Sequence, residues 1–102
     1  MELKPGSRWK SAVCDAQMVI VRPPSTEGEL QCGGVAVLPQ ADAAAPSGTI
    51  DPAHANGVLI GKRYTDAESG IEVLGAKPGA GSLAFNGVAL TLKEAKPLPA
   101  SD

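Results

Sequence analysis

A chain of 102 residues is long enough for one hydrophobic core and too short for two, so the sequence predicts a single domain over residues 1–102. Apolar residues make up 43% of the chain, but sixteen of them are alanine, which indicates a modest core that a protein partner or self-association would help to stabilise. The net charge of −2 creates no field that would attract nucleic acid, and no apolar run approaches the roughly 18 residues of a membrane span. We therefore expect a protein partner or self-association, no membrane partner, and nucleic acid only as a weaker alternative.

The first six residues contain neither the basic block nor the apolar block of a signal peptide, so the expected location is the cytoplasm. In that compartment, two cysteines in a short chain are more often thiols or metal ligands than a structural disulfide. The state of these two thiols is thus the main chemical question that the sequence raises.

Two segments near the start of the chain show the alternation of apolar residues that is typical of half-buried strands. The even positions of residues 12–20 and of residues 30–38 are apolar or glycine, so both Cys14 and Cys32 are predicted to face the interior. Residues 22–28 contain two prolines and end in glycine, which predicts a chain reversal between the segments. Together these patterns predict a hairpin.

The register of this hairpin determines whether the two cysteines can bond. If Arg22 pairs with Leu30, Cys14 and Cys32 lie about six residues apart along the ladder, which is roughly 20 Å. A disulfide requires Cα atoms within about 7 Å of each other. The predicted hairpin therefore excludes a disulfide within one chain.

The rest of the chain alternates turns and short apolar runs. Residues 39–56 lack a strand period and are predicted to form a long mobile surface loop. Asn86-Gly87 is the strongest hairpin signal in the chain, because a type I′ turn needs positive φ at both central positions. Two prolines in residues 93–102 predict an extended tail. The expected later strands are 57–66, 71–77, 83–85 and 88–92.

About six strands with no helical period predict an all-β fold. An open sheet of this size would expose its edges and one apolar face. We therefore expect a small antiparallel barrel or sandwich of five to seven strands, with residues 39–56 as a flexible loop and residues 93–102 as an extended tail.

Four stretches together resemble a group of small, uncharacterised β-rich proteins from actinobacteria. They are LKPGSRW at 3–9, CGG at 32–34, GKRYTDAESG at 61–70 and KEAKPLPASD at 93–102. The resemblance covers most of the chain outside residues 39–56. It implies a bacterial cytoplasmic origin and, since the group has no assigned activity, it implies no site residues.

The cysteines offer one alternative function, a metal or redox site. In Cys32-Gly33-Gly34, glycines leave backbone amides free to point at sulfur, as in metal sites and activated thiols. A closed zinc or iron site needs four ligands. It would therefore require Cys14, Cys32 and His54 with a carboxylate, or two thiolates from each chain of a homodimer. The ordinary interpretation is that both cysteines are small buried apolar residues.

No motif assembles a catalytic site. With a single histidine, only a grouping of Cys32, His54 and Asp51 can be considered, and its spacing does not require it. Residues 75–82 resemble a phosphate-binding loop superficially but are predicted to form a turn, and Glu72 is predicted to be solvated like the other carboxylates. We expect no enzyme activity and no cofactor, apart from the zinc or iron alternative.

A second alternative is a barrel that binds single-stranded nucleic acid. Two basic and aromatic triplets, at residues 8–10 and 62–64, are of the kind that stacks bases and pairs with phosphates. A buried Trp9 with solvated flanking charges is the simpler interpretation.

The function that the sequence favours is a non-catalytic accessory or interaction subunit of a protein assembly. The small core, the proline-containing tail and the missing catalytic motif support it. The predicted protein-contact residues are Trp9, Arg63, Tyr64, Leu98 and Pro99.

Overall fold

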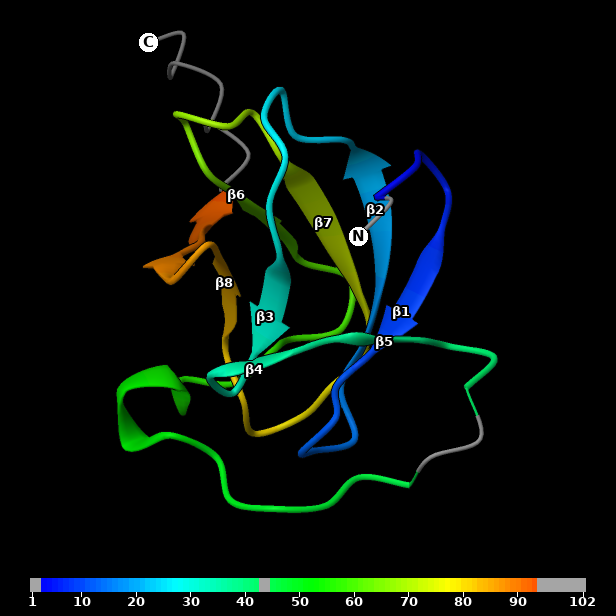
Figure 1. The fold of residues 1–102 in the computed structure, drawn as a ribbon, viewed down its shortest axis with the longest axis vertical. Coiled ribbons are helices and arrows are strands. Elements are labelled where there is room, and N and C mark those ends of the chain that lie inside the picture. The colour runs from blue at the N-terminus through cyan, green and yellow to red at the C-terminus, as the bar shows by residue number, and fades with distance from the viewer. Residues whose placement is uncertain (1–2, 43–44, 94–102) are drawn as a thin grey trace, which may run out of the picture.

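The computed structural model describes residues 3–42 and 45–93, and the regular secondary structure of these residues consists of short antiparallel strands and one 3₁₀ turn (Figure 1). This confirms the predicted all-β class. The elements are β1 (Arg8–Lys10), β2 (Gln17–Arg22), β3 (Leu30–Cys32), β4 (Val35–Ala36), β5 (Leu38–Pro39), the 3₁₀ turn η1 (Pro52–His54), β6 (Arg63–Thr65), β7 (Glu72–Lys77), β8 (Leu83–Phe85), β9 (Val88–Ala89) and β10 (Thr91–Lys93).

The strands form two sheets. The larger sheet has six strands in the order β10-β6-β7-β2-β1-β5, and the smaller has four in the order β4-β3-β8-β9. Neither sheet closes on itself, so the fold is an open two-sheet arrangement and the barrel form of the prediction is not confirmed. The described residues hold more and shorter strands than the five to seven predicted, because several expected strands are interrupted by turns.

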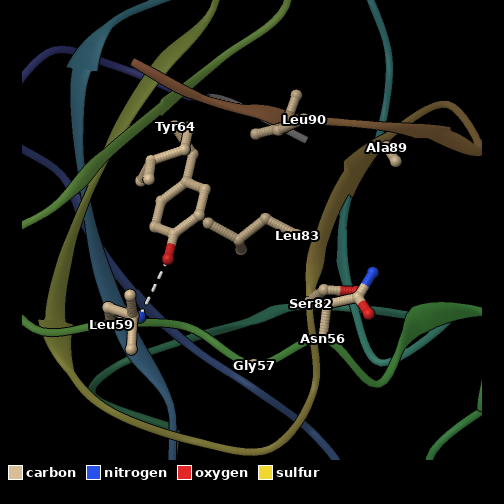
Figure 2. A pocket seen from close by; sticks show the side chains of 9 residues that line it. Asn56, Gly57, Leu59, Tyr64, Ser82, Leu83, Ala89 and Leu90 are labelled. Carbon is tan, nitrogen blue, oxygen red and sulfur yellow. Dashed lines mark hydrogen bonds between the residues drawn. The ribbon is translucent and has the colours of Figure 1, made fainter. Parts of the chain in front are cut away.

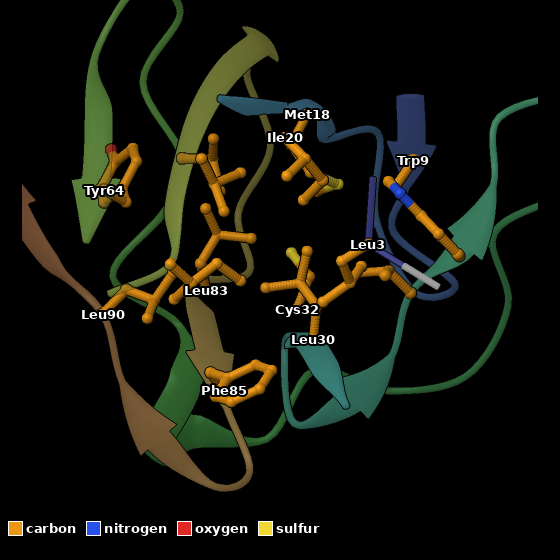
Figure 3. Packing of buried hydrophobic residues seen from close by; sticks show 14 of the residues in the cluster. Leu3, Trp9, Met18, Ile20, Leu30, Cys32, Tyr64, Leu83, Phe85 and Leu90 are labelled. Atoms are coloured by element: carbon orange, nitrogen blue, oxygen red, sulfur yellow. The ribbon is translucent and has the colours of Figure 1, made fainter. Parts of the chain in front are cut away.

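The core lies between the two sheets (Figure 3). Met18 and Ile20 of β2 enter it from the larger sheet, and Leu30 of β3 with Leu83 and Phe85 of β8 enter it from the smaller one. These side chains are at most 3% exposed. Since burying one large apolar side chain contributes about 1.5–3 kcal/mol, the sheets hold together mainly through this shared layer.

The predicted hairpin between the two cysteine-bearing segments is wrong. Arg22 of β2 pairs with Glu72 of β7, and Leu30 of β3 pairs with Phe85 of β8, so β2 and β3 belong to different sheets. The physical reason is that an alternating pattern specifies which face of a strand is buried but leaves its partner open. The connection at residues 23–29 carries the chain from one sheet to the other.

Local sequence signals in the second half of the chain predicted the turns and strands more accurately than the pattern of the first half did. Asn86 and Gly87 have φ values of 51° and 80° and join β8 to β9, as predicted. The strand expected over 71–77 forms as β7. The strand expected over 57–66 shortens to β6, because Val58 makes only an isolated bridge to Gly79 and a turn follows.

The segment predicted as a long loop has no strand after β5 and contains only η1 among its described residues. Its mobility stays a prediction. The predicted extended tail lies outside the described residues except for Lys93, which ends β10.

Candidate functional site

The loop between β1 and β2, residues 11–16, holds Cys14 at the edge of the core. The Ser11 amide donates to the Ala16 carbonyl over 2.9 Å, which closes the loop. The buried Ser11 hydroxyl accepts hydrogen bonds from the backbone amides of Val13 and Cys14, both at 3.1 Å. The loop is thereby held compact, with the Cys14 side chain half-buried against the core.

Cys32 reaches the same place from the other sheet. It is the last residue of β3 and is fully buried. The next amide, that of Gly33, donates to the Ser82 carbonyl over 3.0 Å, so the turn before β8 runs beside the end of β3. A Cβ atom added to Gly81 in this turn would lie 3.3 Å from the Cys32 sulfur.

The two cysteines are neighbours in the fold: Cys14 packs against the core cluster that contains Cys32, and a Cβ atom added to Gly33 would lie 2.7 Å from Val13 Cγ2. Each thiol also affects the pKa of the other. The predicted separation of roughly 20 Å is therefore wrong, and the reason is the wrong hairpin: segments from two sheets meet where a single ladder would have kept them apart. Both cysteines carry free thiols. The Ser11 hydroxyl lies within reach of both sulfurs and can donate its proton to one at a time.

The surroundings give the two sulfurs opposite acidities. Burial raises the pKa of Cys14, but hydrogen bonds from the Ser11 hydroxyl, from two backbone amides and from the neighbouring thiol outweigh it, so that this pKa falls below its ordinary value. The two amides are those of Ala16 and Gly81. Burial, together with the charge of Cys14, raises the pKa of Cys32 to about 12. Cys14 is thus the sulfur that ionises first, and Cys32 stays protonated.

His54, the third predicted ligand, does not complete a metal site. Among residues 3–42 and 45–93, no group of three or more histidine, cysteine or acidic side chains is arranged to hold a metal ion. Two thiolates supply only half of a four-ligand zinc or iron site, so the residues present do not fit such a group within one subunit.

The catalytic grouping of Cys32, His54 and Asp51 also lacks a hydrogen bond between the Asp51 carboxylate and the His54 Nδ1 atom. The Asp51 carboxylate caps η1 by accepting from the Ala53 amide over 2.9 Å. The His54 Nδ1 atom is buried and has no hydrogen-bond partner among the described residues. Asp51 therefore does not orient the imidazole through this nitrogen, as a catalytic triad would require.

Two of the predicted contact residues, Trp9 and Tyr64, are core residues. Trp9 is 9% exposed and its Nε1 atom donates to the Ser7 hydroxyl over 3.0 Å. Tyr64 is 8% exposed, and its oxygen accepts from the Leu59 amide over 2.9 Å (Figure 2). These rings leave little surface for a partner or for stacking on bases.

The other predicted contact residues are Arg63, Leu98 and Pro99. The Arg63 side chain is 55% exposed and pairs with a carboxylate over 3.3 Å. Leu98 and Pro99 lie outside the described residues.

That carboxylate belongs to Glu72, which was predicted to be solvated and is instead 5% exposed. It lies in β7 and also accepts from Lys93 Nζ over 2.8 Å. The hydrogen bond from Lys93 lowers the pKa of Glu72, burial opposes this, and the charges of Lys93 and two arginines lower it further. The prediction failed because strand pairing brings Arg63 and Lys93 to its side.

A groove of about 250 Å³ is lined by Ser82, at the end of the turn before β8, and by residues of several other segments (Figure 2). Tyr64, Leu83 and Leu90 form its apolar wall, and Asn56 and Ser82 form a polar end. Its volume is below that of typical ligand pockets, about 300–1,000 Å³. The groove by itself therefore indicates no small-molecule ligand.

Sequence reasoning missed three residues of the thiol site: Ser11, Ala16 and Gly81. The first had a usable signal, because a serine three residues before a cysteine can bond that residue's amide through its side chain. Gly81 was part of a recognised turn, but only the fold shows that this turn lies against both cysteine-bearing segments.

Within the part of the chain that the structure describes, no helix is both long and apolar enough to cross a bilayer. Comparison of the sequence with models of protein families, with curated proteins and with solved structures found no match, so the thiol site is interpreted from its own geometry.

Proposed function

We propose that the protein is a thiol redox protein in which Cys14 and Cys32 of one subunit interconvert between two thiols and a disulfide. The observation that carries the proposal is the proximity of the two cysteines, one on the loop between β1 and β2 of the larger sheet and the other in β3 of the smaller sheet. The sequence favoured a passive accessory role on the basis of the small core, the proline-containing tail and the missing catalytic motif, and it also placed the two thiols far apart. That last premise no longer holds.

The two cysteines have the complementary environments that such chemistry needs. Cys14 is half-buried on a loop, and its sulfur accepts hydrogen bonds that stabilise a thiolate, which is the reactive form. Cys32 is fully buried, so a reagent in solution does not reach it directly. Cys14 is therefore the attacking sulfur, and Cys32 is the resolving sulfur that closes the disulfide.

The surrounding backbone favours movement of Cys14 rather than of Cys32. A disulfide bond is about 2.0 Å long, so the two free sulfurs must move closer together before they can bond. Cys32 lies in β3, which pairs with β4 on one side and β8 on the other. Cys14 lies between strands, in a loop held by the Ser11 side chain. Oxidation should thus rearrange residues 11–16 and leave β3 in place.

We place this activity in the cytoplasm. Glutathione and thioredoxin keep cytoplasmic thiols reduced, so the resting state would be the dithiol and the disulfide would form transiently. The raised pKa of Cys32 also stabilises the protonated dithiol against spontaneous closure.

The proposal is tested by equilibrating the full chain with mixtures of oxidised and reduced dithiothreitol, followed by acid quenching and alkylation. We expect wild-type protein to lose both thiols, with a mass decrease of about 2 Da and no crosslink between chains. The matched variants Cys14→Ser and Cys32→Ser should each keep one thiol and form no internal bond. Retention of both thiols under strongly oxidising mixtures, or crosslinks between chains alone, would contradict the proposal.

A second candidate is the accessory role, with a second copy of the chain as partner. Leu59 and Ile60 are 54% and 63% exposed, and Leu92 beside the groove is 40% exposed. Exposed apolar patches of this kind mark interaction surfaces. Light scattering over a wide concentration range should show a dimer that Leu59→Asp abolishes and Val21→Asp does not. A monomer at every concentration would rule out this role.

A further inference from the structure

We infer that the natural oxidant of Cys14 is a small hydroperoxide, ROOH, and that the disulfide forms through a sulfenic acid. This inference rests on the proposed redox function and adds the class of substrate. It follows from the space around Cys14, from the donors at its sulfur and from the position of the second thiol.

The space around Cys14 is limited by three stretches of backbone. Its own loop is closed by the bond from Ser11 to Ala16. The Ser47 amide donates to the Ala12 carbonyl over 2.9 Å, which places the long loop along one side. The turn at residues 79–82 packs against Ala16 and donates the Gly81 amide to the sulfur. A protein disulfide would need its own backbone close to this sulfur, whereas a hydroperoxide has to bring only two oxygen atoms.

The donors at Cys14 suit attack on an O–O bond. Two backbone amides and one hydroxyl, those of Ala16, Gly81 and Ser11, surround the sulfur that ionises. Such preorganised donors stabilise the negative charge of the attacking thiolate. They belong to turns packed against one another, so little rearrangement is needed during the reaction.

The reaction balances in two steps. The Cys14 thiolate attacks the hydroxyl oxygen of ROOH, an S–O bond forms, the O–O bond breaks, and RO⁻ takes a proton from water to leave as ROH. Sulfur loses two electrons and the peroxide gains them. The Cys32 thiol then attacks the Cys14 sulfenic acid, an S–S bond forms, and its proton leaves with the hydroxyl group as water. Two equivalents of a small thiol restore the dithiol and are themselves joined as a disulfide.

The position of Cys32 suits the second step. Cys14 packs against the core that contains Cys32, so a sulfenic acid formed on Cys14 has a second thiol close to it. Burial of Cys32 also keeps bulk oxidant away from it. Over-oxidation of Cys14 should therefore be slow as long as Cys32 is present.

The experiment uses hydrogen peroxide and the full reduced chain. A free cysteine carries only a few per cent thiolate at pH 7, so we expect the wild-type protein to react about tenfold faster than cysteine and to yield the disulfide with one equivalent of peroxide. In Cys32→Ser, dimedone should trap a sulfenic acid on Cys14. In Cys14→Ser, the remaining thiol should react no faster than free cysteine.

The outcomes separate this inference from the proposed function. If dithiothreitol mixtures close the disulfide but peroxide reacts no faster than it does with free cysteine, the hydroperoxide inference is overturned and the redox function stands. If neither reagent closes the disulfide, both are overturned. Dimedone labelling on Cys32 instead of Cys14 would reverse the assigned roles and also overturn the inference.

Discussion

A Cβ atom added to Gly79 would lie 2.5 Å from the backbone nitrogen of Ala16, closer than real Cβ atoms approach other heavy atoms. This close approach places the turn before β8 directly against the loop that holds Cys14. The same Ala16 amide is one of the two that donate to the Cys14 sulfur. The absence of a side chain at Gly79 is therefore a condition for the geometry of the thiol site.

Replacing Gly79 by alanine should destabilise the protein and slow the reaction of Cys14. The backbone of residues 78–82 or of Ala16 would have to shift, which costs about 1–3 kcal/mol of the free energy of unfolding. Urea unfolding of the reduced and the oxidised protein measures the loss of stability. The alkylation rate of Cys14 measures its reactivity.

The control for this substitution is Gly61→Ala. Gly61 has a φ of +77° but no heavy atom within 4 Å of an added Cβ, so it tests backbone strain without a clash. Strain alone costs about 1–2 kcal/mol. A smaller loss of stability in Gly79→Ala than in Gly61→Ala would show that the close contact does not constrain the fold.

Replacing Ser11 by alanine should raise the pKa of Cys14, because a hydrogen bond to its thiolate is lost. A higher pKa lowers the thiolate fraction at neutral pH, so the rate of alkylation at pH 7 should fall by about threefold to tenfold. The pH at which the alkylation rate of Cys14 is half-maximal should also move upward. The rate with iodoacetamide from pH 5 to 10, resolved by peptide mass, measures both.

Ser25→Ala is the matched control, since Ser25 is exposed and follows β2, at the opposite end of this strand from the loop that contains Ser11. The Ser11 hydroxyl also accepts from two backbone amides, so circular dichroism must show that Ser11→Ala is folded. An unchanged pH midpoint in a folded variant would limit Ser11 to a structural role.

Replacing Glu72 by glutamine should destabilise the protein by about 1 kcal/mol near neutral pH, because its ion pairs with Arg63 and Lys93 are lost. The folded-state pKa of Glu72 is lowered, so its stabilising effect is present above the unfolded pKa of about 4.3 and is lost as pH falls through the folded value. The difference between wild type and variant should therefore shrink below pH 4.

Thermal unfolding from pH 3 to 8 measures this difference, and Glu68→Gln at an exposed turn position serves as its control. A difference between wild type and Glu72→Gln that stays constant across the whole range would show that the charge on Glu72 contributes nothing.

Replacing Asn86 by alanine should cost about 1–2 kcal/mol of stability. Its side-chain oxygen accepts from the Glu29 amide over 2.8 Å, and its φ of 51° is unfavourable for alanine. Asn86→Gly removes the bond but relieves the strain, so it should lose less. Equal losses in urea unfolding would assign the whole effect to the hydrogen bond.

Local features of the fold follow from the sequence alone. The Asn86-Gly87 turn forms because few residues other than asparagine and glycine accept positive φ at these positions. Met18 and Ile20 are buried as their alternation predicts, because the side-chain period of a strand depends only on its own backbone. The all-β class follows from the same short-range patterns.

The thiol site follows only from the tertiary structure. Cys14 and Cys32 meet because β2 pairs with β7 and β3 pairs with β8, and these pairings join segments about 50 residues apart in the chain. Alternation of apolar residues identifies the buried face of each strand, but the choice of neighbour depends on how all the strands pack around one core. The sequence by itself determined that both cysteines belong to strands or loops bordering the core. Only the packing of two sheets decided that the two cysteines lie side by side.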